Sequence, residues 1–131
     1  MFLQYLDDGQ RRALVIFAYY IMAADHDLAP EEKAIIAALE HELTLPEDIH
    51  PAEMLVEPLF SQFTDRRSRM AVMLKLNAVA HADRMIHPAE KALLDDYAGR
   101  IGLSRKDVAA LDKWGRRHTE LVEQARKLIE E

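Results

Sequence analysis

Four acidic residues stand at matching places in two copies of one short motif. Asp25 is followed seven positions later by Glu32, and Asp83 is followed by Glu90 with the same spacing, 58 positions further along the chain. Both copies fit the pattern Ala-Asp-x-x-[Leu/Ile]-x-Pro-x-Glu-Lys-Ala. The sequence therefore predicts two equivalent acidic turns, each carrying a carboxylate pair.

If the two turns pack against each other, up to four negative charges meet in one region. Like charges at such short range require a cation or raised pKa values. Carboxylate oxygens suit Ca²⁺, Mg²⁺ or Mn²⁺, and the imidazole of His26 or His87 nearby would shift the preference toward Zn²⁺. On this interpretation the ligands of a weakly bound divalent cation are Asp25, Glu32, Asp83 and Glu90.

A structural role for the same carboxylates is equally open. Asp25 and Asp83 can accept hydrogen bonds from backbone amides of their own turns. Glu32 and Glu90 fall at the third position of a helix, from which a glutamate reaches back to the N-cap amide. In that case each acid serves its own loop, and no cation is needed.

Helical patterns surround both turns. Apolar residues recur at spacings of three and four on either side of each turn, which is typical of one face of an α-helix. Pro30 and Pro88 take the first helical position after each turn, and Gly102 is a helix stop. Ser104 and Asp107 resemble a capping box at the start of a last helix. Helices are expected at about 8–24, 30–43, 64–82, 88–101 and 104–130.

These patterns predict an all-α fold, a single-domain helical bundle of about six or seven helices. One or two short helices are expected between positions 47 and 63, with Pro51 opening a helix and Pro58 bending or ending it. The single domain covers 1–131, its two repeat halves cover roughly 8–45 and 64–103, and the final helix covers 104–130. The residues of the second helix that we expect to face inward are Ala34, Ile35, Ala38, Leu39 and Leu43, and those of the last helix include Leu121 and Leu128.

Composition excludes several functions. The chain has 131 residues, a net charge of −6, no cysteine and only four glycines. A nucleic-acid partner is not expected without a basic stripe, and neither is a disulfide or thiolate site. No apolar run is long enough for direct membrane insertion, and no secretory signal is recognisable, so a cytoplasmic location is expected. Without a phosphate-binding loop or a catalytic triad, the chain is not expected to be an enzyme.

The doubled motif, with Met22-Ala23-Ala24-Asp25 leading into the first copy, resembles the tellurite-resistance TerB family from about Asp8 to Ile101. That resemblance implies a compact bundle with two similar halves, and a role in tellurite resistance or in membrane-associated stress-response complexes. It also implies metal binding by the acidic residues of both turns. One departure is that His26 and Arg84 stand where the family commonly has glycine. Arg84 could itself neutralise the acidic cluster.

Two functions follow. The first is a TerB-like binding module that binds a divalent cation and contributes to a stress-response or metalloid-resistance assembly through an unknown protein partner. The second is a metal-free protein-interaction or scaffold domain, in which a groove or the long amphipathic final helix docks a partner.

Overall fold

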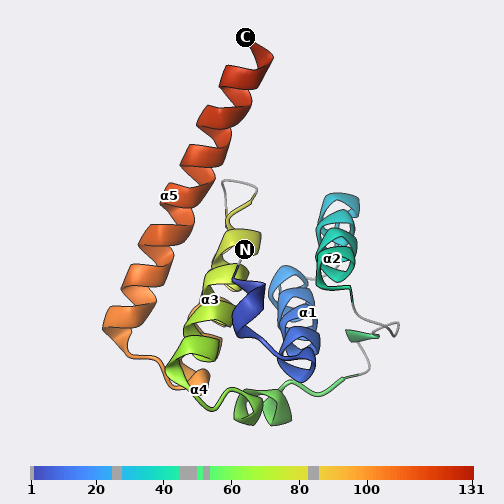
Figure 1. Cartoon of the computed structure of the whole chain (residues 1–131), viewed down its shortest axis with the longest axis vertical. Helices are drawn as coiled ribbons and strands as arrows, with labels where there is room; N and C mark the ends of the chain where they lie inside the picture. Colours follow the sequence, from blue (N-terminus) through green and yellow to red (C-terminus); the bar gives the residue numbers. More distant parts are fainter. Residues whose placement is uncertain (1, 25–27, 45–49, 52–53, 83–85) are drawn as a thin grey trace.

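The computed structural model describes residues 2–24, 28–44, 50–51, 54–82 and 86–131. Within these ranges the chain is helical and has no strand, which confirms the all-α prediction (Figure 1). The helices form a bundle. They are η1 (Leu3–Tyr5), α1 (Asp8–Met22), α2 (Pro30–Leu43), η3 (Glu57–Gln62), α3 (Arg66–Ala80), α4 (Pro88–Ile101) and α5 (Arg105–Glu130).

The four helices α1 to α4 form two matching pairs. Helices α1 and α3 begin and end 58 positions apart, and so do α2 and α4. The caps match as well, because Asp7 accepts a hydrogen bond from the N–H of Gln10 (2.8 Å) and Asp65 accepts one from Ser68 (2.8 Å). Each cap satisfies a backbone donor that the first helical turn leaves without a partner. Both acidic turns therefore lie between equivalent helices.

The second helix of each pair ends in a left-handed residue. Gly102 follows α4 with φ of 105°, and this confirms the predicted stop. Thr44 follows α2 with φ of 50°, at the equivalent position. Glycine adopts this conformation freely, whereas a residue with a Cβ atom pays a steric cost.

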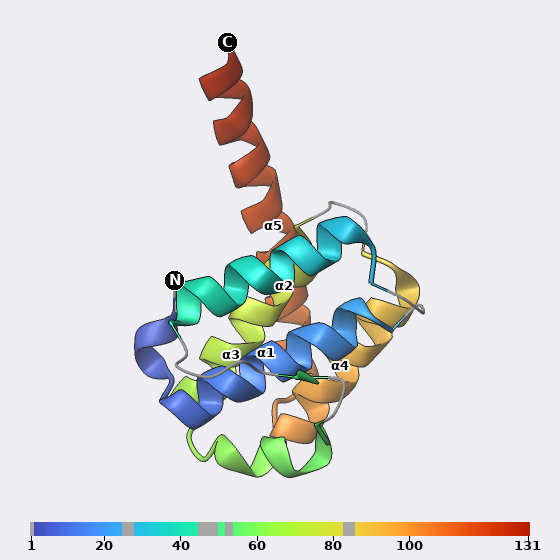
Figure 2. The ribbon, with the colours of Figure 1, turned by 90° about the vertical axis from the view of Figure 1, so that its right-hand side faces the viewer.

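Helix α1 forms the centre of the core. Figure 2 shows it crossing the body with α2 above it and η3 below. Phe17 is fully buried there and its ring contacts those of Phe60 (5.1 Å), Phe63 (6.0 Å) and Tyr97 (5.3 Å between centroids). This aromatic cluster joins α1 to η3 and α4. Such packing contributes both apolar burial and favourable ring geometry.

Two local predictions were wrong. Ala34 and Ala38 of the expected inward face are exposed, whereas Leu39 and Leu43 of that face are buried as expected, together with Ile36. The larger side chains remove more apolar surface from water, so they determine which face of the helix turns inward. Pro58 does not end a helix but stands in the first turn of η3, where its missing N–H costs no hydrogen bond.

Helix α5 leaves the body halfway along its length. Its first half packs on α3 and α4, where Leu111 and Gly115 are its buried residues. The second half extends past the rest of the chain (Figures 1 and 2). Leu121 and Leu128, which were expected to face inward, are 64% and 72% exposed. We call residues 118–130 the free half of α5. In the described part of the chain, no helix is both long and apolar enough to cross a membrane.

Candidate functional site

The acidic turns are described only in part. Asp25 and Asp83 lie outside the described residues, so the structure does not place them. Glu32 lies in the first turn of α2, and its Oε1 accepts a hydrogen bond from the N–H of Ala29 (3.1 Å). Glu90 occupies the equivalent position of α4. The geometry of Glu32 is that of the structural role, in which the carboxylate caps its own helix.

The described residues do not by themselves form a metal site. Among them, no group of three or more His, Asp and Glu side chains is placed to hold an ion. His87, considered above as a ligand for Zn²⁺, is the N-cap of α4, and its Nδ1 accepts a hydrogen bond from the N–H of Ala89 (3.1 Å). The four-carboxylate site depends on Asp25 and Asp83, and it stays a prediction.

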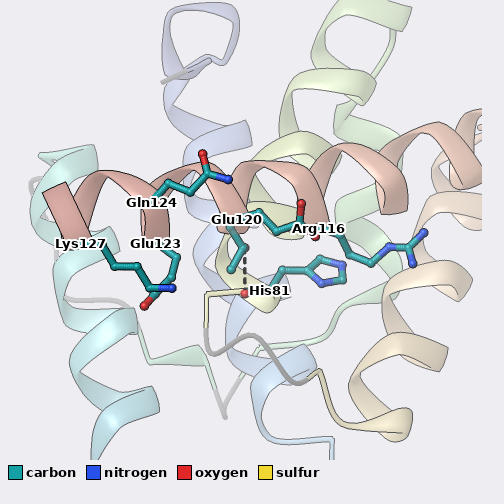
Figure 3. A pocket seen from close by; sticks show the side chains of 7 residues that line it. His81, Arg116, Glu120, Glu123, Gln124 and Lys127 are labelled. Carbon is teal, nitrogen blue, oxygen red and sulfur yellow. Dashed lines mark hydrogen bonds between the residues drawn. The ribbon is translucent and has the colours of Figure 1, made fainter.

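A pocket of about 420 Å³ lies between α5 and the end of α3. Figure 3 shows His81, at the end of α3, beneath the stretch of α5 that lines the pocket. The lining residues are His81, Arg116, Thr119, Glu120, Glu123, Gln124 and Lys127. Two basic and two acidic side chains balance each other there, so the pocket offers no net charge to a small ion.

His81 is the most unusual residue of this pocket. It is the C-cap of α3 and is only 3% exposed. Its Nε2 has no hydrogen-bond partner in the described structure and lies 3.5 Å from Oδ1 of Asp112. Burial lowers the pKa of His81, while the Asp112 carboxylate raises it and the charges of Lys91 and Arg116 lower it further. The ring is therefore neutral at neutral pH.

Asp112 connects three elements through its charge. It lies 3.1 Å from the guanidinium of Arg116 on its own helix and 3.7 Å from Nζ of Lys91 on α4. Lys91 also contacts Asp95, at 2.6 Å. Partly exposed ion pairs of this kind contribute little each, about 0–1 kcal/mol, so they orient α5 more than they stabilise it.

Close packing fixes the first half of α5. A hydrogen bond runs from the hydroxyl of Thr119 to the carbonyl oxygen of His81 (2.9 Å). Gly115 faces His81 and Asn77 at a distance that leaves no room for a Cβ atom. These contacts hold α5 against α3 as far as Thr119, which lies at the start of the free half.

The free half presents an apolar face to solvent. Seven large hydrophobic residues are exposed in the described chain, and four of them lie here, so this is where exposed apolar surface concentrates. Their exposed fractions are 64% for Leu121, 47% for Val122, 72% for Leu128 and 84% for Ile129. The sequence signal was present, because these residues continue the apolar spacing of Leu111. Periodicity identifies the apolar face of a helix but not what covers it.

Comparisons of the chain with family models, with curated proteins and with solved structures found no match. The resemblance to the TerB family therefore rests on the doubled motif itself.

Proposed function

We propose that this chain is a cytoplasmic, TerB-like binding module without enzymatic activity, which holds another protein through the free half of α5. The observation that carries the proposal is the apolar face of a helix that has left its own body. Soluble proteins rarely expose contiguous apolar surface unless it binds something. An amphipathic helix laid against a partner's groove or helix is a common recognition mode.

The energy available at this face is substantial. Full burial of a leucine or isoleucine side chain contributes about 1.5–3 kcal/mol relative to exposure. Leu121, Leu128 and Ile129 are each more than half exposed, so most of that contribution is still unused. A partner that covers all three would gain enough to offset part of the entropy lost on association.

The charges around this face favour a protein over a membrane surface. Helices that lie on membranes carry mainly Lys and Arg on their polar face. The free half, residues 118–130, instead holds three acidic and two basic residues, namely Glu120, Glu123, Glu130, Arg126 and Lys127. The resemblance to the TerB family suggests that the partner belongs to a tellurite-resistance or stress-response assembly.

Cation binding is the second candidate function. The observation that supports it is that the helices before and after one turn begin and end 58 positions from those around the other turn. The two turns are therefore held between equivalent helices. The ligands would be Asp25, Glu32, Asp83 and Glu90. Because Glu32 already caps Ala29, a cation would compete with that hydrogen bond, and we expect weak binding.

The proposed function can be tested by measuring the native mass of the protein, by size-exclusion chromatography, in extracts of the cells that make it. Leu121→Glu with Leu128→Glu adds two negative charges on the apolar face. Lys113→Gln with Lys127→Gln changes the net charge equally at exposed polar positions of α5. Wild type and the lysine variant should elute well above the 15.0 kDa monomer, and the leucine variant should elute as the monomer. Equal elution of all three would overturn the proposal.

A further inference from the structure

We infer that the free half of α5 pairs with the same segment of a second copy of this chain, with the two helices antiparallel. The inference rests on the proposed function, because it names the occupant of the same face. Three observations support it: the spacing of the apolar residues, the charges beside them, and the point at which α5 leaves the body.

The apolar residues of α5 follow a heptad repeat. Their spacing alternates between three and four, which is the pattern of the a and d positions in a coiled coil. These positions are Leu111, Trp114, His118, Leu121, Ala125 and Leu128. Val122 and Ile129 flank the same seam. The seam starts inside the body, at buried Leu111, and continues uncovered along the free half.

A heptad seam is complementary to a second copy of itself, as a two-fold interface requires. In the antiparallel alignment, Leu121 lies opposite Ala125 of the second copy, and His118 lies opposite Leu128. Leu121 thus meets the smaller alanine side chain, and Leu128 meets the flat imidazole ring. A parallel alignment would set Ala125 against Ala125 and leave space at that layer.

The charges beside the seam favour the antiparallel alignment. It places Arg117 next to Glu131 of the second copy, and the two-fold axis repeats that pair at the other end. Polar Gln124 meets its own copy at the centre. In the parallel alignment, Arg117 would lie beside Val122 of the second copy, and Gln124 beside its Ile129. No pair of opposite charges would form there.

The body of the protein sets the length of the overlap. Gly115 is the last buried residue of α5, and the paired segment 118–128 begins just beyond it. The antiparallel arrangement also puts the two bodies at opposite ends, where they do not collide. The overlap is about 16 Å long at 1.5 Å per residue. Such a short interface is at the weak, transient end of the size range, so the dimer should dissociate on dilution.

Sedimentation velocity of the purified chain from about 5 to 500 μM tests the pairing. The wild type and Lys113→Gln/Lys127→Gln should shift from monomer to dimer as concentration rises. Leu121→Glu/Leu128→Glu should stay monomeric throughout, with an unchanged melting temperature showing that its body is folded. A wild type that stays monomeric, or a leucine variant that dimerises like wild type, would overturn the pairing.

Distances between spin labels test the orientation. The chain has no cysteine, so single cysteines at Lys113 or Gln124 can be labelled without background. Antiparallel helices should separate the two labels at 113 by roughly 25 Å more than those at 124, given 1.5 Å per residue. Equal separations would show parallel helices and contradict the inference.

The two proposals fail in different ways. In one outcome, the purified wild type stays monomeric, yet in extracts it has a high native mass that the leucine variant loses. That outcome would contradict the pairing but support the proposed function, with a different protein bound to the apolar face. Monomeric behaviour in both experiments would remove both proposals.

Discussion

A Cβ atom at position 115 would lie 2.7 Å from Cδ2 of His81, closer than carbon atoms in proteins pack. The same Cβ would lie 3.3 Å from Cβ of Asn77. His81 and Asn77 are both buried, so neither can move aside easily. This contact sets how closely α5 approaches α3.

We therefore expect Gly115→Ala to destabilise the protein. Overpacking of a tight site costs about 1–3 kcal/mol, while alanine in place of glycine within a helix contributes about 1 kcal/mol in the opposite direction. The net loss in the free energy of unfolding should be about 1 kcal/mol, measured by urea denaturation.

Gly99→Ala is the matched control for this substitution. Gly99 lies in α4, and a Cβ atom there would meet nothing within 4 Å. The helix propensity then acts alone and should raise stability by about 0.5–1 kcal/mol. A Gly115→Ala variant as stable as Gly99→Ala would mean that α5 does not approach α3 this closely.

The left-handed residues that end α2 and α4 make a second prediction. Thr44→Gly should raise the free energy of unfolding by about 1 kcal/mol, because glycine removes the steric cost of φ at 50°. Gly102→Thr, at the equivalent position, should lower stability by a similar amount. Both values come from thermal or urea denaturation. A loss of stability in Thr44→Gly would contradict the left-handed geometry at that position.

Buried His81 makes the stability depend on pH. Burial holds its pKa in the folded protein below the ordinary value of about 6.5, so the folded chain stays unprotonated where the unfolded chain takes up a proton. The stabilising contribution is therefore fully present above about pH 6.5. It is lost as pH falls from there toward the lower pKa of the folded state. Asp112, Lys91 and Arg116 face the ring and modify the effect.

His81→Gln should reduce the slope of stability against pH between about pH 7 and 5. Denaturation across that range measures it, with His41→Gln as the control at an exposed histidine of α2. The control should retain the wild-type slope. If His81→Gln retains it as well, His81 does not cause the pH dependence.

The cation proposal is tested by titrating metal-free protein with Ca²⁺, Mn²⁺ and Zn²⁺. A shared site predicts that the melting temperature rises with cation concentration, by linkage to the folded state. Asp25→Ala and Asp83→Ala should each abolish this response. Each should also raise the metal-free melting temperature, because one repelling charge is gone.

The structural role of the turns gives the opposite result. If Asp25 and Asp83 cap their own turns, no cation changes the melting temperature, and each alanine variant loses about 1 kcal/mol of stability. That outcome would leave the protein-binding proposal unaffected.

The sequence predicted those parts of the fold that are determined locally. Caps and stops act within a few residues, and Pro30, Pro88, Gly102 and Ser104 therefore marked helix ends correctly. The overall helical class followed from the apolar periodicity. Glu32 also took the helix-capping role that the sequence offered as one alternative.

Features that depend on distant residues could not be predicted in the same way. The burial of His81 requires Gly115, which is 34 positions away and on another helix. The exposure of Leu121 and Leu128 depends on where the body ends, whereas their spacing resembles that of a core-facing helix. On α2, the predicted inward face included Ala34 and Ala38 beside Leu39 and Leu43, and the structure buries the two leucines but not the alanines.

Photo-cross-linking in the cells that make the protein tests the central claim most directly. A benzophenone amino acid placed at Leu121 or Leu128 should form a discrete adduct, of dimer mass if the partner is a second copy. The same group at Lys127, exposed on the pocket side of α5, should form none. Adducts of equal yield at Leu121 and Lys127, or none at either, would contradict the claim that the apolar face of the free half binds a protein.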